Sequence, residues 1–293
     1  MHIPVMVKQV IKFMAPKSKG IYLDATVGEG GHAKAILEAS SPDGYLVCSD
    51  MDKEMLSIAE KNLEGFEGRV NFIHANYKDI DEIAKLSGVE GFDGILIDLG
   101  FNSSQIEDPD RGFSFFKEGP LDMRYDKTSK LNAYDVVNKF DKARLSEIIK
   151  EYGEERSYKR IAQAIVTARK STPIKTTVEL ANIVSSVKKG SYGIHPATKT
   201  FQAIRIFVNN ELENLSVFLK RVVNFLNTDG VLVIISFHSL EDRIVKHAFK
   251  QLSTLTKPVF KILTRKLVVP EEEEIESNPR ARSAGLRAIK RVA

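Results

Sequence analysis

The sequence is poor in cysteine and has no long apolar run. It contains a single cysteine, Cys48, so no disulfide can form within the chain and a cluster of thiolate metal ligands is excluded. No stretch approaches the ~20 apolar residues that a membrane-spanning helix needs. Residues 1–20 lack the basic start and apolar core of a secretory signal. These absences predict a cytoplasmic protein without a membrane segment.

The charge of the chain is nearly balanced, since the formal net charge is only +4. Composition alone therefore does not indicate a nucleic-acid-binding protein. Basic side chains nevertheless gather in two places, where they can bind phosphates or simply face solvent. The two groups are Arg280, Arg282, Arg287, Lys290 and Arg291 near the end of the chain, and Arg156, Lys159, Arg160, Arg169 and Lys170 in its middle.

The first hundred residues alternate between short apolar runs and helical stretches. Strands are predicted at 21–24, 45–49, 70–73 and 94–98, and helices at 32–39 and from the N-cap Asp52 to about residue 63. This alternation is typical of βαβ units, and it predicts a Rossmann-like α/β fold with a parallel sheet and helices on both faces.

Beyond Gly100 the pattern changes, because strand-like runs are scarce up to residue 193. Helices are predicted over 143–152, 158–170 and 177–188. We interpret this part as an inserted helical domain. The expected division is an α/β domain of residues 1–104 and 194–293, with the insertion at 105–193.

The α/β pattern then resumes with apolar residues at helical spacing from 200 to 226. Asp229 and Gly230 are expected to end that helix, and the apolar run 231–235 predicts a buried strand. Residues 258–269 and 284–292 predict two final antiparallel strands. The acidic run 271–274 is interpreted as a solvated loop.

A glycine-rich turn follows the first predicted strand and contains Gly28, Gly30 and Gly31. Glycines let the backbone approach a ligand closely, and the helix that follows offers free N–H groups. Asp50 closes the second strand, where a carboxylate can accept hydrogen bonds from ribose hydroxyls. The arrangement predicts a site for a cofactor that contains adenosine.

Two classes of cofactor remain open on these residues. Gly28, Gly30 and Ala33 also fit the dinucleotide fingerprint of nicotinamide-dependent oxidoreductases. Asp24, at the end of the first strand, favours methyl transfer, because its carboxylate could bind the amino-acid part of S-adenosylmethionine.

Further candidate site residues follow the later strands. Tyr77 comes after the third strand and could pack near an adenine or at the sheet edge. Asp98 ends the fourth strand, and Gln105 lies just beyond it. His238 follows the buried strand 231–235. Ligands of open α/β sheets bind at the carboxyl ends of strands, so we expect Asp98 and His238 at one crevice.

Several long motifs occur in one order along nearly the whole chain. They are His2-Ile3-Pro4-Val5, residues 24–32, 98–105, 111–115, 119–124, 152–156, 195–203, 236–243 and Asn278-Pro279-Arg280-Ala281-Arg282-Ser283. With these motifs the chain resembles the bacterial family of 16S ribosomal RNA methyltransferases that modify the N4 atom of a cytidine in the decoding region. Phe101 and Asn102 depart from this family, where smaller residues are common.

The resemblance implies a class I methyltransferase that uses S-adenosylmethionine on the small ribosomal subunit. It implies cofactor contacts at Gly30, Gly31, His32, Asp50, Tyr77, Asp98 and Gln105. Asp98 and His238 are the candidate catalytic residues. The insertion would recognise the RNA, with no DNA or membrane as partner. A non-catalytic RNA-binding assembly factor is the remaining alternative, and whether the chain forms a homodimer stays open.

Two expectations concern the substrate base and metal ions. A cytosine must leave its stack to be methylated, and Phe101, Phe113, Phe115 and Phe116 are aromatic candidates either for stacking on RNA or for core packing. His2, His74 and His247 show no metal-binding spacing with nearby acids, so no required metal is expected.

Overall fold

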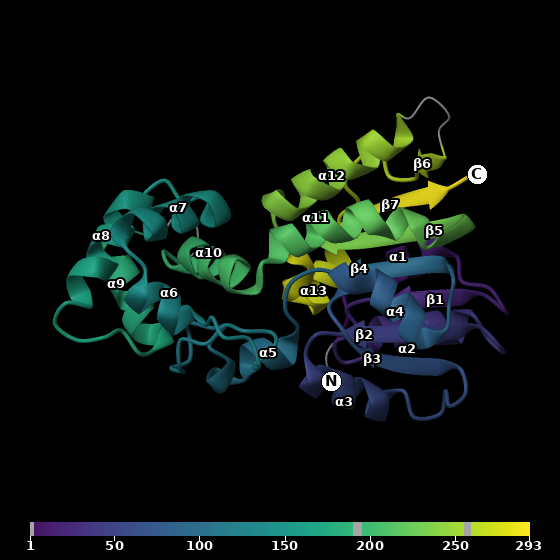
Figure 1. Cartoon of the computed structure of the whole chain (residues 1–293), viewed down its shortest axis with the longest axis horizontal. Coiled ribbons are helices and arrows are strands. Elements are labelled where there is room, and N and C mark those ends of the chain that lie inside the picture. The colour runs from purple at the N-terminus through teal and green to yellow at the C-terminus, as the bar shows by residue number, and fades with distance from the viewer. Residues whose placement is uncertain (1–2, 190–194, 255–258) are drawn as a thin grey trace. The chain divides into compact units, whose positions relative to one another are not determined.

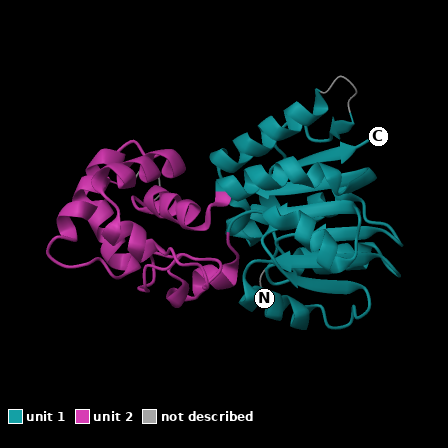
Figure 2. Ribbon diagram, viewed as in Figure 1, with its two compact units in different colours: residues 1–100, 212–293 teal, residues 101–211 magenta. Residues whose placement is uncertain are grey.

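The chain leaves one structural unit after its first hundred residues and later returns to it. The computed structural model describes residues 3–189, 195–254 and 259–293. The first unit comprises residues 1–100 and 212–293, and the second comprises 101–211 (Figure 2). The predicted boundary at 193/194 lies within 190–194, outside the described residues. The chain rejoins the first unit only at Leu212, so the predicted return was too early.

The first unit is built on a seven-stranded sheet of order β3-β2-β1-β4-β5-β7-β6 (Figure 1). Its strands are β1 (Ile21–Asp24), β2 (Tyr45–Asp50), β3 (Val70–His74), β4 (Phe92–Asp98), β5 (Leu226–Ser236), β6 (Phe260–Ile262) and β7 (Gly285–Arg291). The first five are parallel, whereas β7 runs antiparallel to both β5 and β6. The predicted Rossmann-like sheet and its antiparallel final strands are confirmed.

Alternate strand residues point to opposite faces, and each face is covered by helices. One face carries α1 (Val7–Met14), α2 (Gly31–Ala39) and α3 (Lys53–Asn62), and the other carries α4 (Ile80–Ser87), α11 (Glu211–Arg221) and α12 (Ser239–Ser253). Val231 and Val233 pack on the α1–α3 side, and Leu232 and Ile234 on the other. Because both faces are buried, β5 can be apolar throughout this stretch.

The second unit is helical among its described residues. It contains α5 (Ser103–Glu107), α6 (Ala133–Lys139), α7 (Lys142–Gly153), α8 (Tyr158–Ala168), α9 (Thr177–Val187) and α10 (Thr198–Asn209). The three helices predicted in this region correspond to α7, α8 and α9. Helix α10 packs on α7, which explains why it belongs to this unit.

Three local predictions were wrong. The helical pattern 200–226 is broken at Asn210, whose left-handed backbone (φ 51°) caps α10 before α11 begins. Asp229, also left-handed (φ 67°), lies within β5 instead of ending a helix. The acidic run opens α13 (Glu272–Ser277), because carboxylates in a first turn are favoured by the helix dipole.

Among the described residues, no helix combines the length and the apolar character that crossing a bilayer requires.

Candidate active site at the carboxyl edge of the sheet

Three neighbouring parallel strands each end in an aspartate. Asp24 ends β1, Asp50 ends β2 and Asp98 ends β4. Strands β2 and β4 both pair with β1, so the three carboxylates lie along one edge. The strand order reverses between β1 and β4, which is where ligands bind in open α/β sheets.

The glycine-rich turn after β1 is held against this edge by backbone hydrogen bonds. The N–H of Gly28 donates to Oδ2 of Asp50 over 2.9 Å. Gly30 caps α2 with a left-handed backbone (φ 88°) that side chains rarely adopt. A Cβ on Gly31 would lie only 2.8 Å from Cγ of Pro4, so the N-terminal segment packs directly on the turn.

His32, in the first turn of α2, is buried beside two of the carboxylates. Its Nε2 lies 3.6 Å from Oδ2 of Asp98, which is beyond hydrogen-bonding distance. Neither ring nitrogen of His32 has a hydrogen-bond partner among the described residues, and the same holds for Oδ2 of Asp24 and Oδ1 of Asp98. Buried polar atoms are normally satisfied, so this group of atoms is suited to receive a polar ligand.

The same burial changes the acidity of these groups. Burial raises the pKa of Asp24 to about 7, although the neighbouring His32 opposes the change. Burial also raises the pKa of Asp50 to about 6, against the hydrogen bonds from the backbone of Asp52 and Gly28. Burial alone would lower the pKa of His32, but Asp98 and Asp24 outweigh it and the pKa is raised.

Tyr77 and Gln105 have different surroundings. The N–H of Ala75 donates to the carbonyl of Asp50, so the segment leading to Tyr77 lies at the same edge. The Tyr77 ring packs edge-on against Phe218 of α11, with centroids 5.7 Å apart. Gln105 belongs to the second unit, where it forms a capping box with Asn102 at the start of α5.

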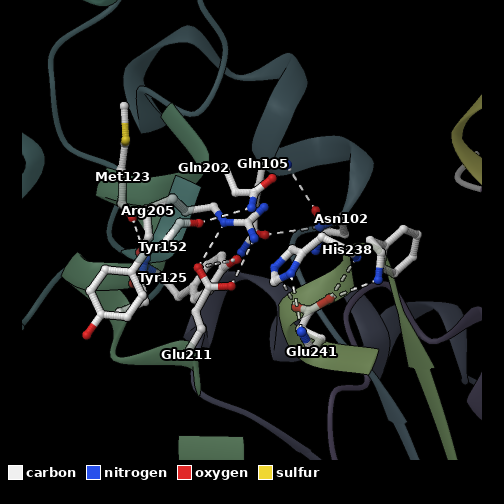
Figure 3. A network of polar contacts seen from close by, with 12 residues as sticks. Asn102, Gln105, Met123, Tyr125, Tyr152, Gln202, Arg205, Glu211, His238 and Glu241 are labelled. Carbon is white, nitrogen blue, oxygen red and sulfur yellow. Dashed lines mark hydrogen bonds and ion pairs between the residues drawn. The ribbon is translucent and has the colours of Figure 1, made fainter. Parts of the chain in front are cut away.

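His238 is the N-cap of α12 (Figure 3). Its Nδ1 accepts a hydrogen bond from the N–H of Glu241, and its Nε2 lies 3.2 Å from a carboxylate oxygen of that buried glutamate. A capping role for this histidine is therefore visible. Glu241 was not among the predicted site residues, and neither was Thr26, whose hydroxyl accepts from the N–H of Asp98 over 2.8 Å.

A buried ion pair organises the second unit (Figure 3). Arg205 of α10 binds Glu211 through two hydrogen bonds of 2.8 and 3.0 Å, and its guanidinium lies 4.6 Å from the centroid of the Phe101 ring. Arg111 is also buried and donates to the carbonyls of residues 124 and 125. Several motif residues thus hold the loops of this unit in place.

Most of the predicted basic residues near the C-terminus already have partners within the first unit. Arg287 is bound to Asp242, Lys290 pairs with Asp229 over 2.6 Å, and Arg291 donates to backbone carbonyls. In the second unit, Arg169 donates to the carbonyls of residues 137 and 140. These four side chains are weaker candidates for phosphate binding than the sequence suggested.

The fold and the site together define an α/β enzyme of the class I methyltransferase type. The profile of the MraW methylase family matches residues 1–292, and the chain belongs to that family.

Two relatives are similar along their whole length. A protein from Thermotoga neapolitana named ribosomal RNA small subunit methyltransferase H is 49% identical over 298 residues, covering 99% of this chain and 96% of the relative. A protein of the same name from Caldicellulosiruptor bescii is 45% identical, with 99% of both chains covered. A solved structure described as a putative rRNA-methylase from Clostridium thermocellum covers 100% of this chain at 10% identity and a TM-score of 0.48.

The cofactor of this methylase is S-adenosylmethionine, and the residues at the sheet edge fit it. Gly28 and Gly30 adopt the left-handed backbone that glycine tolerates, and this turn lies beside the carboxylate of Asp50. The unpartnered oxygen of Asp24 suits the cofactor's ammonium group, and the carboxylate of Asp50 suits its ribose hydroxyls. When these buried carboxylates are ionised, little water screens them, so they attract a cationic ligand more strongly than exposed carboxylates would.

We expect the affinity for S-adenosylmethionine to rise about tenfold between pH 5.5 and pH 7. Asp24 is largely protonated below its pKa of about 7, and only its ionised form attracts the ammonium group. Isothermal titration calorimetry across this pH range should give the dependence of the Kd on pH. Asp24→Asn should bind S-adenosylmethionine weakly. Its affinity should also lose most of the dependence on pH and keep only the smaller part that arises from Asp50.

Thermal unfolding without cofactor provides the control. Since the folded-state pKa of Asp24 is raised from 3.8 to about 7, its contribution to stability is fully present below pH 3.8 and is lost as the pH rises through 7. Asp24→Asn should therefore be more stable than the parent protein at pH 8. An unaltered pH profile of binding in Asp24→Asn would contradict the assignment.

Proposed function

We propose that the protein transfers a methyl group from S-adenosylmethionine to the N4 atom of a specific cytidine in the decoding region of 16S ribosomal RNA, in the cytoplasm. The observation that carries this proposal is the 49% identity to a small-subunit rRNA methyltransferase over 99% of the chain. Both the acidic edge of the first unit and the helical second unit are included in that similarity.

The reaction needs an acceptor for a proton of the N4 amine. Bound S-adenosylmethionine supplies an electrophilic methyl group on a sulfonium, so the residues of the chain mainly provide position and electrostatics. As the N–C bond forms and the S–C bond breaks, N4 loses a proton. Asp98 is our candidate for this acceptor, because its Oδ1 is buried without a partner among the described residues.

We propose that the second unit recognises the RNA. Its aromatic side chains support this role, because Phe115 stacks on His195 with centroids 4.6 Å apart and contacts Phe201 edge-on at 5.0 Å. The ring centroids of Phe116 and Phe115 are 4.7 Å apart, and Phe116 is 80% exposed. Exposed aromatic rings bind unstacked RNA bases through their faces.

The first test is methyl transfer from labelled S-adenosylmethionine to small ribosomal subunits that lack the modification, with naked 16S rRNA in parallel. We expect label in N4-methylcytidine at a single position of the RNA. Nucleoside analysis by mass spectrometry identifies the modified base. Cofactor binding without any label in either substrate would overturn the proposed function.

Replacing Asp98 should slow the chemical step. Asp98→Asn removes the proton acceptor, and general-base catalysis typically contributes about 10²- to 10⁴-fold. We expect kcat at saturating cofactor to fall by at least about 10²-fold, with the RNA KM little changed. Single-turnover kinetics separate this step from binding. Full turnover in Asp98→Asn would rule out the acceptor role.

Replacing Phe116 should weaken RNA binding alone. Base–aromatic stacking contributes about 1–3 kcal/mol, so Phe116→Ala should raise the RNA KM roughly 5- to 150-fold. Phe116→Trp should retain affinity, because it keeps an aromatic face. Leu86→Ala is the matched control, since Leu86 is also exposed (59%) but carries no aromatic ring and belongs to the first unit. Equal KM values for Phe116→Ala and Leu86→Ala would exclude stacking.

A further inference from the structure

A basic pocket lies on the first unit, between α12 and the last two strands. Its volume is about 300 Å³. Its lining includes Lys246 and Lys250 of α12, Thr264 and Arg265 after β6, and Arg287 of β7. The lining contains four cations and no carboxylate. This pocket is separate from the sheet edge that carries Asp24, Asp50 and Asp98.

Only one of the four positive charges of the pocket, that of Arg287, is neutralised by a described carboxylate. Lys246, Lys250 and Arg265 are exposed, and none of them forms an ion pair with another described residue. Asp242 uses both of its oxygens on Nε and Nη2 of the buried Arg287. These two bonds do not involve Nη1 of that arginine. Three cations therefore remain available for an anionic ligand.

The floor of the pocket differs from its rim. Phe249 is buried and belongs to the core between α12 and the sheet, and Ile262 of β6 packs against that core. The hydroxyl of Thr264 accepts from the N–H of Ala288, which leaves its own proton for a ligand. A cationic rim over an apolar floor is suited to a sugar-phosphate unit better than to a free carboxylate.

The pocket lies along a helix that starts at the reaction edge. Helix α12 begins just after β5, whose Ile235 is paired with Asp98. Lys246 and Lys250 are one turn apart on the same helix face, about 10 and 16 Å from its start at 1.5 Å per residue. A strand whose target base is at the edge can thus reach the pocket within a few nucleotides.

We propose that this pocket binds the sugar-phosphate backbone of the substrate RNA, a few nucleotides from the methylated cytidine. The inference rests on the proposed function, since it takes ribosomal RNA as the substrate. Lys246, Lys250 and Arg265 contact phosphate oxygens, and Arg287 fixes the wall of the pocket through Asp242. The pocket contributes affinity and register but no sequence readout.

The test compares two triple variants that lose the same charge. In the first, Lys246, Lys250 and Arg265 are all replaced by Gln. In the second, three exposed lysines of α1, α3 and α4 are replaced by Gln, namely Lys12, Lys61 and Lys85. The KM for unmodified small subunits and the affinity for naked 16S rRNA are measured between 50 and 200 mM salt.

The pocket variant should show a KM at least about tenfold higher at 0.1 M salt, and the slope of log K against log salt should shrink by about 2. Its Kd for S-adenosylmethionine and its kcat at saturating RNA should stay unchanged. In the control variant, the KM and the salt slope for RNA should change far less. Equal shifts in the two variants would indicate long-range attraction only and overturn the pocket.

The failure of the pocket and the failure of the proposed function give different results. If the pocket variant is active and the salt dependence of its RNA binding is unchanged, the proposed phosphate-binding role of the pocket is overturned and the proposed function is not. Absence of methyl transfer by the parent protein overturns the proposed function, and the binding of naked RNA then still decides whether the pocket holds phosphates.

Discussion

The structure depends on the convergence of three carboxylates at one edge of a parallel sheet. Parallel pairing of β1 with β2 and β4 brings Asp24, Asp50 and Asp98 to one edge, where Asp50 and Asp98 extend two residues beyond the level of Asp24. Like charges in a buried site repel each other, so this arrangement is costly without compensation. His32 and the N–H groups around Gly28 compensate part of this cost, and the edge is suited to a cationic cofactor that would compensate more of it.

Much of this edge could be predicted because its signals are local. Apolar runs of strand length end directly in the three aspartates, and a glycine turn follows the first of them. The burial that raises the pKa of Asp24 was not visible in the sequence, since it requires α2 and the sheet to close around the carboxylate. The contact between Pro4 and Gly31 likewise joins segments that no local pattern connects.

The wrong predictions share one origin: a local sequence pattern was overridden by a backbone conformation or a contact that the pattern does not show. Apolar spacing from 200 to 226 predicts one helix, but a single left-handed residue, Asn210, overrides it and places α10 and α11 in different units. The acidic run was taken for a loop on its charge, although its position at a helix start makes that charge favourable. The basic C-terminal residues looked available because their partners, such as Asp242 and Asp229, are distant in sequence.

The pairing of β4 with β5 has a consequence for how the protein is made. These strands are neighbours in the sheet, yet the whole second unit separates them in sequence. During synthesis, β4 emerges with the apolar residues Ile95 and Ile97 and can pair with β1, but its other edge has no partner until β5 is translated. The cofactor residues of the nascent chain are complete by then, but the sheet that holds them is not. The exposed edge of β4 is therefore the point at which a partly made chain is most prone to aggregate.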